Sequence, residues 1–159
     1  MVLLQQVGAG VVFVLLTLCL QCVGVAALVT WLRKILTREV HNLRMSYAAA
    51  LVMQAAIAII ILQGLAILLW AGCYRWLCFS SWQSAFYYSA SSYSTVGYGD
   101  LVIPAQWRLL GPLESITGVL MCGISVSLLF TLVSRLVARE APEAPQELGT
   151  EPPVAQRHG

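Results

Sequence analysis

Residues 95–100, with the sequence Thr-Val-Gly-Tyr-Gly-Asp, carry the residue types in this chain that are best suited to chemistry. Gly97 and Gly99 are separated by one residue, so they interrupt a helix and open backbone angles that are closed to other residues. Such a segment can turn successive carbonyl oxygens toward the same side, which a run of ordinary L-residues would do only with strain. The available chemistry is therefore electrostatic, because carbonyl oxygens are the negative ends of the peptide dipoles.

A short helix is expected immediately before this segment. Ser80 and Ser81 are suitable helix caps, and the sequence predicts a helix over residues 81–92. Four aromatic side chains lie on it: Trp82, Phe86, Tyr87 and Tyr88. The carboxyl end of a helix carries partial negative charge, which this helix would direct at the segment that follows it.

The composition places these elements in a membrane protein. The 159 residues are 59% hydrophobic and 10% charged, whereas soluble domains average about 45–50% apolar and 25% charged residues. Three apolar blocks, 7–32, 47–70 and 109–133, reach the roughly 20 residues that a membrane-spanning helix needs. The first block is predicted to be a retained span, because residues 1–6 lack Lys and Arg and the block exceeds the apolar length of a signal peptide.

Basic residues predict the orientation of these spans. They gather after the first span, at Arg33, Lys34, Arg38 and Arg44, and after the third, at Arg135, Arg139 and Arg157. By the positive-inside rule both regions are cytoplasmic, which leaves the amino terminus extracytoplasmic in the cell membrane. The connector over residues 33–46 is either a topology anchor and short link or a basic segment that senses anionic lipid at its four basic residues. No base-stacking patch accompanies these residues, so nucleic acid is not an expected partner.

The segment between the second and third spans is too polar and too short to cross the bilayer. Non-helical backbone at membrane depth is tolerated only when it is buried in protein or lines a wet cavity. In this setting the Thr-Val-Gly-Tyr-Gly-Asp sequence resembles the selectivity signature of the potassium channel family. The resemblance covers about residues 47–135, two spans around a re-entrant loop, while the first span and the tail lie outside it.

The resemblance implies an all-α membrane protein that assembles as a tetramer. Its three transmembrane helices would carry a re-entrant pore helix and filter loop between the second and third. The expected parts are an amino-terminal span at 1–32, a basic linker at 33–46, a pore domain at 47–138 and a disordered tail at 139–159. Within the pore domain we expect an outer helix at 47–72, a pore helix at 81–92, the filter at 95–100 and an inner helix at 109–136.

The resemblance also implies roles for individual residues. K⁺, the permeant ion, would be coordinated by Thr95, Val96, Gly97 and Tyr98, with Gly99 completing the filter backbone. Filter support would come from Asp100, Trp82, Tyr87, Tyr88 and Ser91. The chain departs from familiar members here, since Tyr87 and Tyr88 replace tandem tryptophans and Ser91 replaces the glutamate of certain members.

The third span holds two glycines where the family bends its inner helix. Gly123 is the preferred gating hinge and Gly118 the second candidate, although close helix packing is an equally weighted reading of both. Glu114, at the outer end of the same span, lies either near the back of the filter or exposed at the membrane interface.

The expected function is passive potassium transport by a homotetramer. The alternatives are a non-conducting modulatory subunit of other channels and a weakly selective cation channel. An enzyme is not expected, because the sequence has no paired carboxylates or nucleophile arrangement, and no cofactor is expected either. Cys73 and Cys78 fall on the predicted outer side, where a disulfide is chemically possible, but a helical spacing of five residues disfavours it.

Overall fold

The computed structural model describes residues 2–38 and 45–140 of the chain. These residues form α1 (Val2–Arg38), α2 (Met45–Leu77), α3 (Trp82–Tyr93), the 3₁₀ turn η1 (Ala105–Trp107) and α4 (Leu110–Glu140). No strand occurs in the described residues, and the predicted all-α fold class is confirmed. Arg44 and residues 141–159 of the predicted tail lie outside the described residues.

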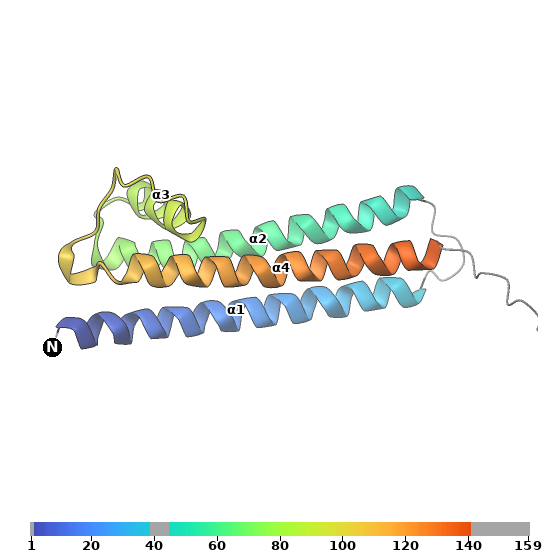
Figure 1. The fold of residues 1–159 in the computed structure, drawn as a ribbon, viewed down its shortest axis with the longest axis horizontal. Coiled ribbons are helices and arrows are strands. Elements are labelled where there is room, and N and C mark those ends of the chain that lie inside the picture. Colours follow the sequence, from blue (N-terminus) through green and yellow to red (C-terminus); the bar gives the residue numbers. More distant parts are fainter. Residues whose placement is uncertain (1, 39–44, 141–159) are drawn as a thin grey trace, which may run out of the picture.

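The three long helices lie side by side as an elongated bundle (Figure 1). α3 is inclined against one end of this bundle, where it contacts α2 and α4. The start of α1 lies at the same end as α3, and the last turn of α4 lies at the opposite end. α1 contacts both α2 and α4 along its length, so it belongs to the same packed unit as the re-entrant segment.

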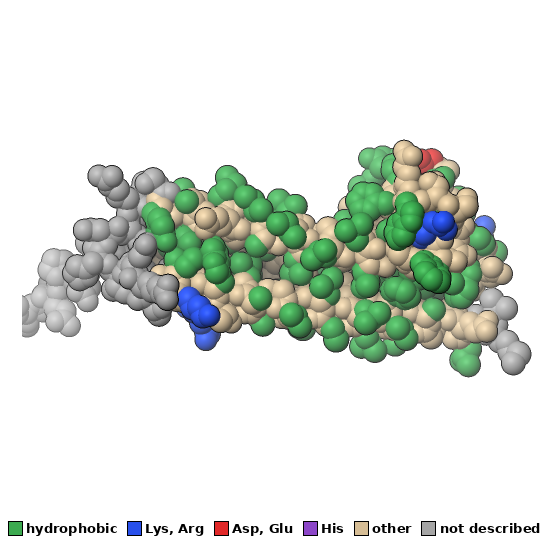
Figure 2. All heavy atoms as spheres, turned by 180° about the vertical axis from the view of Figure 1, so that it is seen from behind, with side chains coloured by type: hydrophobic (Ala, Val, Ile, Leu, Met, Phe, Trp, Pro, Cys, Tyr) green, Lys and Arg blue, Asp and Glu red, His purple; other side chains and the backbone are tan. Residues whose placement is uncertain are grey.

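Three helical stretches are long and apolar enough to cross a membrane: Leu4–Ile35, Tyr47–Leu77 and Ala105–Ala138. Hydrophobic side chains cover the middle of the molecule, and Lys and Arg side chains lie toward its two ends (Figure 2). A lipid-facing surface requires this distribution, because charged groups are costly in hydrocarbon. The chain is therefore a multi-pass membrane protein.

All three long helices extend beyond the spans expected from hydropathy, and α4 runs past residue 136 to Glu140, into the first residues of the expected tail. α1 continues through the basic residues to Arg38, so the expected linker at 33–46 is helical in its first part. Residues 33–38 contain no Gly or Pro, and Lys and Arg are good helix formers, so nothing local ends the helix at Leu32. α2 likewise runs past residue 72 to Leu77, because Cys73 and Tyr74 are buried in the core.

The larger hydrophobic core lies at the end of the bundle that carries α3. Trp70 and Tyr74 of α2 are fully buried there, together with Leu110 and Met121 of α4. Phe13 of α1 packs on Trp70 with 5.7 Å between the ring centroids. A smaller cluster joins the other ends of the long helices: Leu28, Leu32, Ala55, Leu132 and Leu136. The re-entrant helix is thus supported by the best-packed part of the chain.

Candidate functional site

The loop after α3 leaves the helical conformation at three residues with positive φ. Gly97 has φ +56° and Gly99 has φ +77°, as the two-glycine pattern predicts. Thr95 also has a positive φ, +62°, which sequence reasoning did not anticipate. For a β-branched residue this conformation is strained by about 1–3 kcal/mol, so the surrounding structure must hold it in place.

Backbone amides of the loop are directed back at the carboxyl end of α3. The amide of Thr95 donates to the carbonyl of Ser92 at 3.0 Å, and that of Gly97 donates to the carbonyl of Ser91 at 3.1 Å. Among the described residues, no group donates a hydrogen bond to the backbone carbonyls of residues 95–99. The amides of Thr95 and Gly97 are therefore used within the chain, while the carbonyl oxygens of the loop remain available to a ligand outside it.

Ser91 is a predicted support residue that makes two hydrogen bonds with the loop backbone. Besides its carbonyl contact with Gly97, its hydroxyl oxygen accepts from the amide of Tyr98 at 3.3 Å. A cavity of about 160 Å³ opens beside it, between α3 and the loop. The lining residues are Tyr87, Tyr88, Ser91, Ser92, Gly97, Gly99, Asp100 and Leu101.

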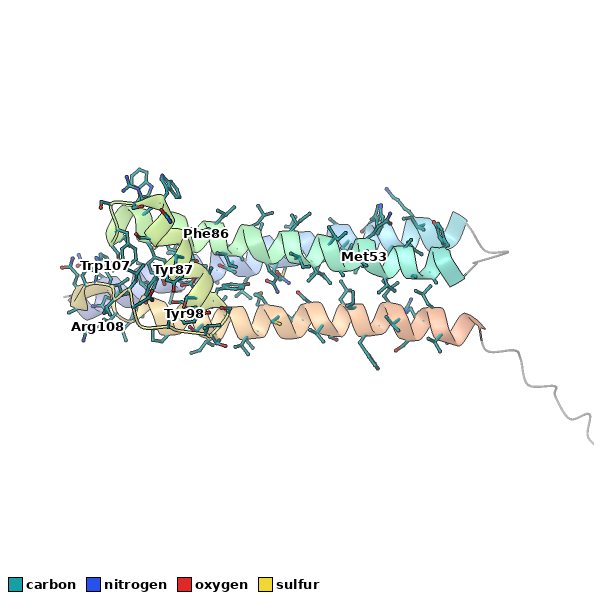
Figure 3. All side chains as sticks on the ribbon, turned by 90° about the horizontal axis from the view of Figure 1, so that it is seen from above. Met53, Phe86, Tyr87, Tyr98, Trp107 and Arg108 are labelled. Carbon is teal, nitrogen blue, oxygen red and sulfur yellow. The ribbon has the colours of Figure 1, made fainter. Side chains whose placement is uncertain are left out.

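Tyr87 connects α3 to the outer half of the loop. Its ring stacks on Tyr98 with 6.1 Å between centroids and an interplanar angle of 13° (Figure 3). A hydrogen bond between its hydroxyl and Asp100 raises the pKa of Tyr87 above the ordinary value for tyrosine. The Tyr87 hydroxyl therefore keeps its proton, and its role as a donor to Asp100, to a higher pH than an ordinary tyrosine.

The structure does not bring the other two predicted support residues into comparable contact with the loop. Trp82, at the start of α3, is 58% exposed and has no aromatic partner among the described residues. Tyr88 lines the cavity, but its ring packs edge-on against Tyr74 at 4.8 Å and against Phe79 at 5.6 Å. Tyr88 contributes to the core behind α3 more than to the loop.

Glu114 lies at the back of α3 and is fully buried. The sequence left two positions open for it, behind the loop or exposed at the membrane interface, and the structure has the first. The Ser89 hydroxyl of α3 donates to its Oε1 at 2.6 Å, and the Tyr74 hydroxyl of α2 donates to its Oε2 at 2.8 Å. A carboxyl group in this interior needs such partners, because burial without them costs several kcal/mol. One side chain of α4 thereby joins three helices.

Small residues of α4 allow α3 to approach closely. A Cβ at Gly118 would collide with the Tyr93 carbonyl oxygen, and one at Gly111 would collide with the Tyr88 hydroxyl. Between them, the Ser115 hydroxyl lies 2.7 Å from the Ser92 carbonyl. Gly118 is thus a close-packing glycine, whereas a Cβ at Gly123 would meet no atom within 4 Å.

The cysteines and other candidate ligands give no further site in the described part of the chain. Cys73 is buried and Cys78 is half-buried, and both are free thiols; burial raises the pKa of Cys78 to about 11. No group of three or more His, Cys, Asp or Glu side chains is placed to hold a metal ion in residues 2–38 and 45–140.

The outward face of the loop is uncovered in the single chain. The side chain of Val96 is 53% exposed and that of Tyr98 is 69% exposed, although both are apolar or aromatic. Large apolar side chains at this exposure commonly belong to an interaction surface.

Comparison with known protein families gives a match to the region that contains α3 and the loop. A family model described as an ion channel matches residues 51–135, more than half of the chain. The match includes α3, the loop with its positive-φ residues, and most of α2 and α4. No curated protein and no solved structure matches the chain.

Proposed function

Because the chain belongs to this ion channel family, we propose that it is one subunit of a tetrameric, potassium-selective channel for passive transport. The observation that carries the proposal is the backbone of the loop. Gly97 and Gly99 have positive φ within a Thr-Val-Gly-Tyr-Gly sequence, and the loop amides are bonded inward to α3. A loop of this kind presents carbonyl oxygens in place of the water around an ion.

In this proposal K⁺ passes along an axis shared by four copies of the loop. Thr95, Val96, Gly97 and Tyr98 each contribute carbonyl oxygens to rings of ligands, and Thr95 adds its hydroxyl at the inner end. The carboxyl end of α3 directs partial negative charge at the same axis. Each chain supplies one quarter of a ring, and the exposed side chains of Val96 and Tyr98 are the surface that a neighbouring copy would cover.

Support and gating are assigned to different parts of the chain. Asp100 and Tyr87 would fix the outer mouth, and Ser91 would fix the middle of the loop. Gly123 is the proposed hinge, because the space around it leaves the helix free to bend there. Gly118 is not proposed as a hinge, because close packing against Tyr93 already explains why a glycine is needed at this position.

The proposed orientation has the amino terminus outside and the carboxyl terminus in the cytoplasm. Arg33 of α1 and Arg135 of α4 then line one groove at the inner membrane surface, which is otherwise formed by apolar side chains and Thr131. An anionic lipid is a proposed partner there, because guanidinium groups pair with phosphate. Lys34 and Arg38 follow on α1, and Arg44 lies outside the described residues. Flux that rises with the anionic lipid content of the vesicles is the expected result.

Flux from purified protein in liposomes tests the function. The expected result is K⁺ flux that greatly exceeds Na⁺ flux, with protein-free vesicles as the control. Equal flux of the two ions would support a weakly selective cation channel instead. Absence of any flux from a correctly inserted tetramer would support a non-conducting modulatory subunit.

A further inference from the structure

The first span lies outside the region matched by the ion channel family, yet two of its polar side chains are buried against the pore-forming helices. Thr17 is fully buried and accepts a hydrogen bond from the Trp70 indole at 3.0 Å. Gln21, one turn later, is 2% exposed, and its Nε2 donates to the Ser125 hydroxyl oxygen of α4 at 3.0 Å. A helix that only anchors the chain in lipid needs neither group.

From Ser125 the polar contacts continue to the inner end of the filter loop. Gln63 of α2 also donates its Nε2 to the Ser125 oxygen, at 3.3 Å. The Tyr93 hydroxyl donates to Oε1 of the same Gln63 at 2.8 Å. Ser125 gives its own proton to the Met121 carbonyl at 2.9 Å. The chain of contacts thus runs from α1 through α4 and α2 to the last residue of α3.

Tyr93 is the point where this chain of contacts meets the ion path. It is the last residue of α3, two positions before Thr95 with its strained φ. Its backbone carbonyl lies against Gly118, so α4 fixes the main chain while Gln63 fixes the side chain. If the Tyr93 side chain loses its hydrogen bond to Gln63, the residue that precedes the strained backbone is therefore held less firmly.

We propose that Gln21 of the first span is a positioning residue for the inner end of the filter, acting through Ser125, Gln63 and Tyr93. The proposal rests on the proposed conduction through this loop. It assigns α1 a part in setting ion selectivity, in addition to its part in insertion and packing. Gln21 touches no ion, so its effect depends on the intact chain of hydrogen bonds.

The test compares Gln21→Leu with Thr17→Val in liposomes. Both variants remove one buried hydrogen bond between α1 and the pore helices, but only Gln21 belongs to the chain that ends at Tyr93. Gln21→Leu is expected to lower the K⁺/Na⁺ permeability ratio by about threefold, the size of one side-chain hydrogen bond inside a membrane. Thr17→Val is expected to leave the ratio unchanged, and equal ratios in both variants would overturn the proposal.

A double variant checks the route. If Gln21 acts through Tyr93, Gln21→Leu combined with Tyr93→Phe has the ratio of Tyr93→Phe alone, whereas multiplied effects would show independent action and contradict the proposal. Ser125→Ala, which breaks the same link from α4, is expected to reproduce Gln21→Leu.

Hydrogen exchange of the amides of Thr95 and Gly97 gives a readout that does not depend on flux. It is expected to be about threefold faster in Gln21→Leu and unchanged in Thr17→Val. Wild-type protein without flux would contradict the proposed function, while unaltered exchange in Gln21→Leu would contradict this inference alone.

Discussion

The packed back of α3 and the loop that follows this helix are built in opposite ways. Its back is seated on α2 and α4 by buried polar groups, with Ser89 and Glu114 fully buried. The loop that follows it is mostly exposed, with Val96 and Tyr98 at 53% and 69%. Within one chain the support of α3 is therefore buried, whereas the loop that we propose as the ion path is exposed. The support is held by side chains within the chain, whereas the loop is shaped by backbone angles and, in the proposed tetramer, would be covered by other copies.

The largest effect is expected from a substitution that alters the loop and leaves the support of α3 intact. Gly97→Ala adds a methyl group to a residue with φ +56°, where no neighbour crowds it, so the obstacle is the backbone conformation itself. We expect K⁺ flux to be abolished while the protein still assembles. Gly72→Ala, at an uncrowded helical glycine, is the matched control and should keep full flux. Undiminished flux through Gly97→Ala would contradict a backbone-built ion path.

The next effect breaks the support and leaves the loop sequence unchanged. Glu114→Leu leaves the Tyr74 hydroxyl without its acceptor and leaves the Ser89 hydroxyl only the Ile67 carbonyl, which should lower the free energy of unfolding by about 3 kcal/mol. Glu114→Gln keeps the size and one acceptor, so about half of that loss is expected. Unfolding of the purified protein in mild detergent measures both. Equal stability of Glu114→Leu and wild type would show that the buried carboxyl does not hold α3.

A smaller effect tests the close approach of α4. Gly118→Ala places a methyl group against the Tyr93 carbonyl and should destabilise the protein by about 2 kcal/mol. Gly123→Ala, five residues further along the same helix, meets open space and should be neutral or slightly stabilising. Unfolding in detergent measures the stability of both variants. A Gly123→Ala variant that is less stable than Gly118→Ala would contradict the assignment of Gly118 as the glycine required for packing. If Gly123 is the hinge, its alanine variant is stable but passes less K⁺.

The smallest effect concerns the contact between the two regions at the outer mouth. Tyr87→Phe keeps the stacking on Tyr98 and removes only the hydroxyl bond to Asp100. Because that bond raises the pKa of Tyr87, it is present below the ordinary tyrosine pKa and is lost as pH rises through the raised value. We expect wild-type selectivity to decline in strong alkali and Tyr87→Phe to lack that decline. If selectivity declined equally at high pH in both proteins, a group other than Tyr87 would be responsible for the pH dependence.

The sequence predicted the features that depend on local pattern. Three apolar blocks predicted three membrane-length helices, and two spaced glycines predicted positive φ at Gly97 and Gly99. Both follow from properties of the residues themselves, namely their transfer into lipid and their allowed backbone angles. The position of Glu114 was not determined in this way, since a carboxyl at a span end is equally compatible with the interface.

What the sequence did not predict depends on neighbours far along the chain. Gly118 and Gly123 both lie inside the third apolar span, and the approach of Tyr93 to Gly118 is what distinguishes them. The positive φ of Thr95 contradicts its β-branched preference and is held by the end of α3. Gln21 and Gln63 were recognisable as polar residues in apolar spans, but their shared partner Ser125 is separated from Gln21 by 104 positions.

The length of α1 has a consequence for the surrounding lipid. The membrane-spanning stretch of this helix, Leu4–Ile35, has 32 residues and extends about 48 Å at 1.5 Å per residue, beyond a hydrocarbon core of about 30 Å. Such an excess is accommodated by tilt or by thickening of the bilayer around the protein. Because α1 is bonded to α4 near its middle, a change of tilt in a thicker bilayer is transmitted to the bundle. Acyl chain length is thus a physical variable to which this protein is mechanically coupled.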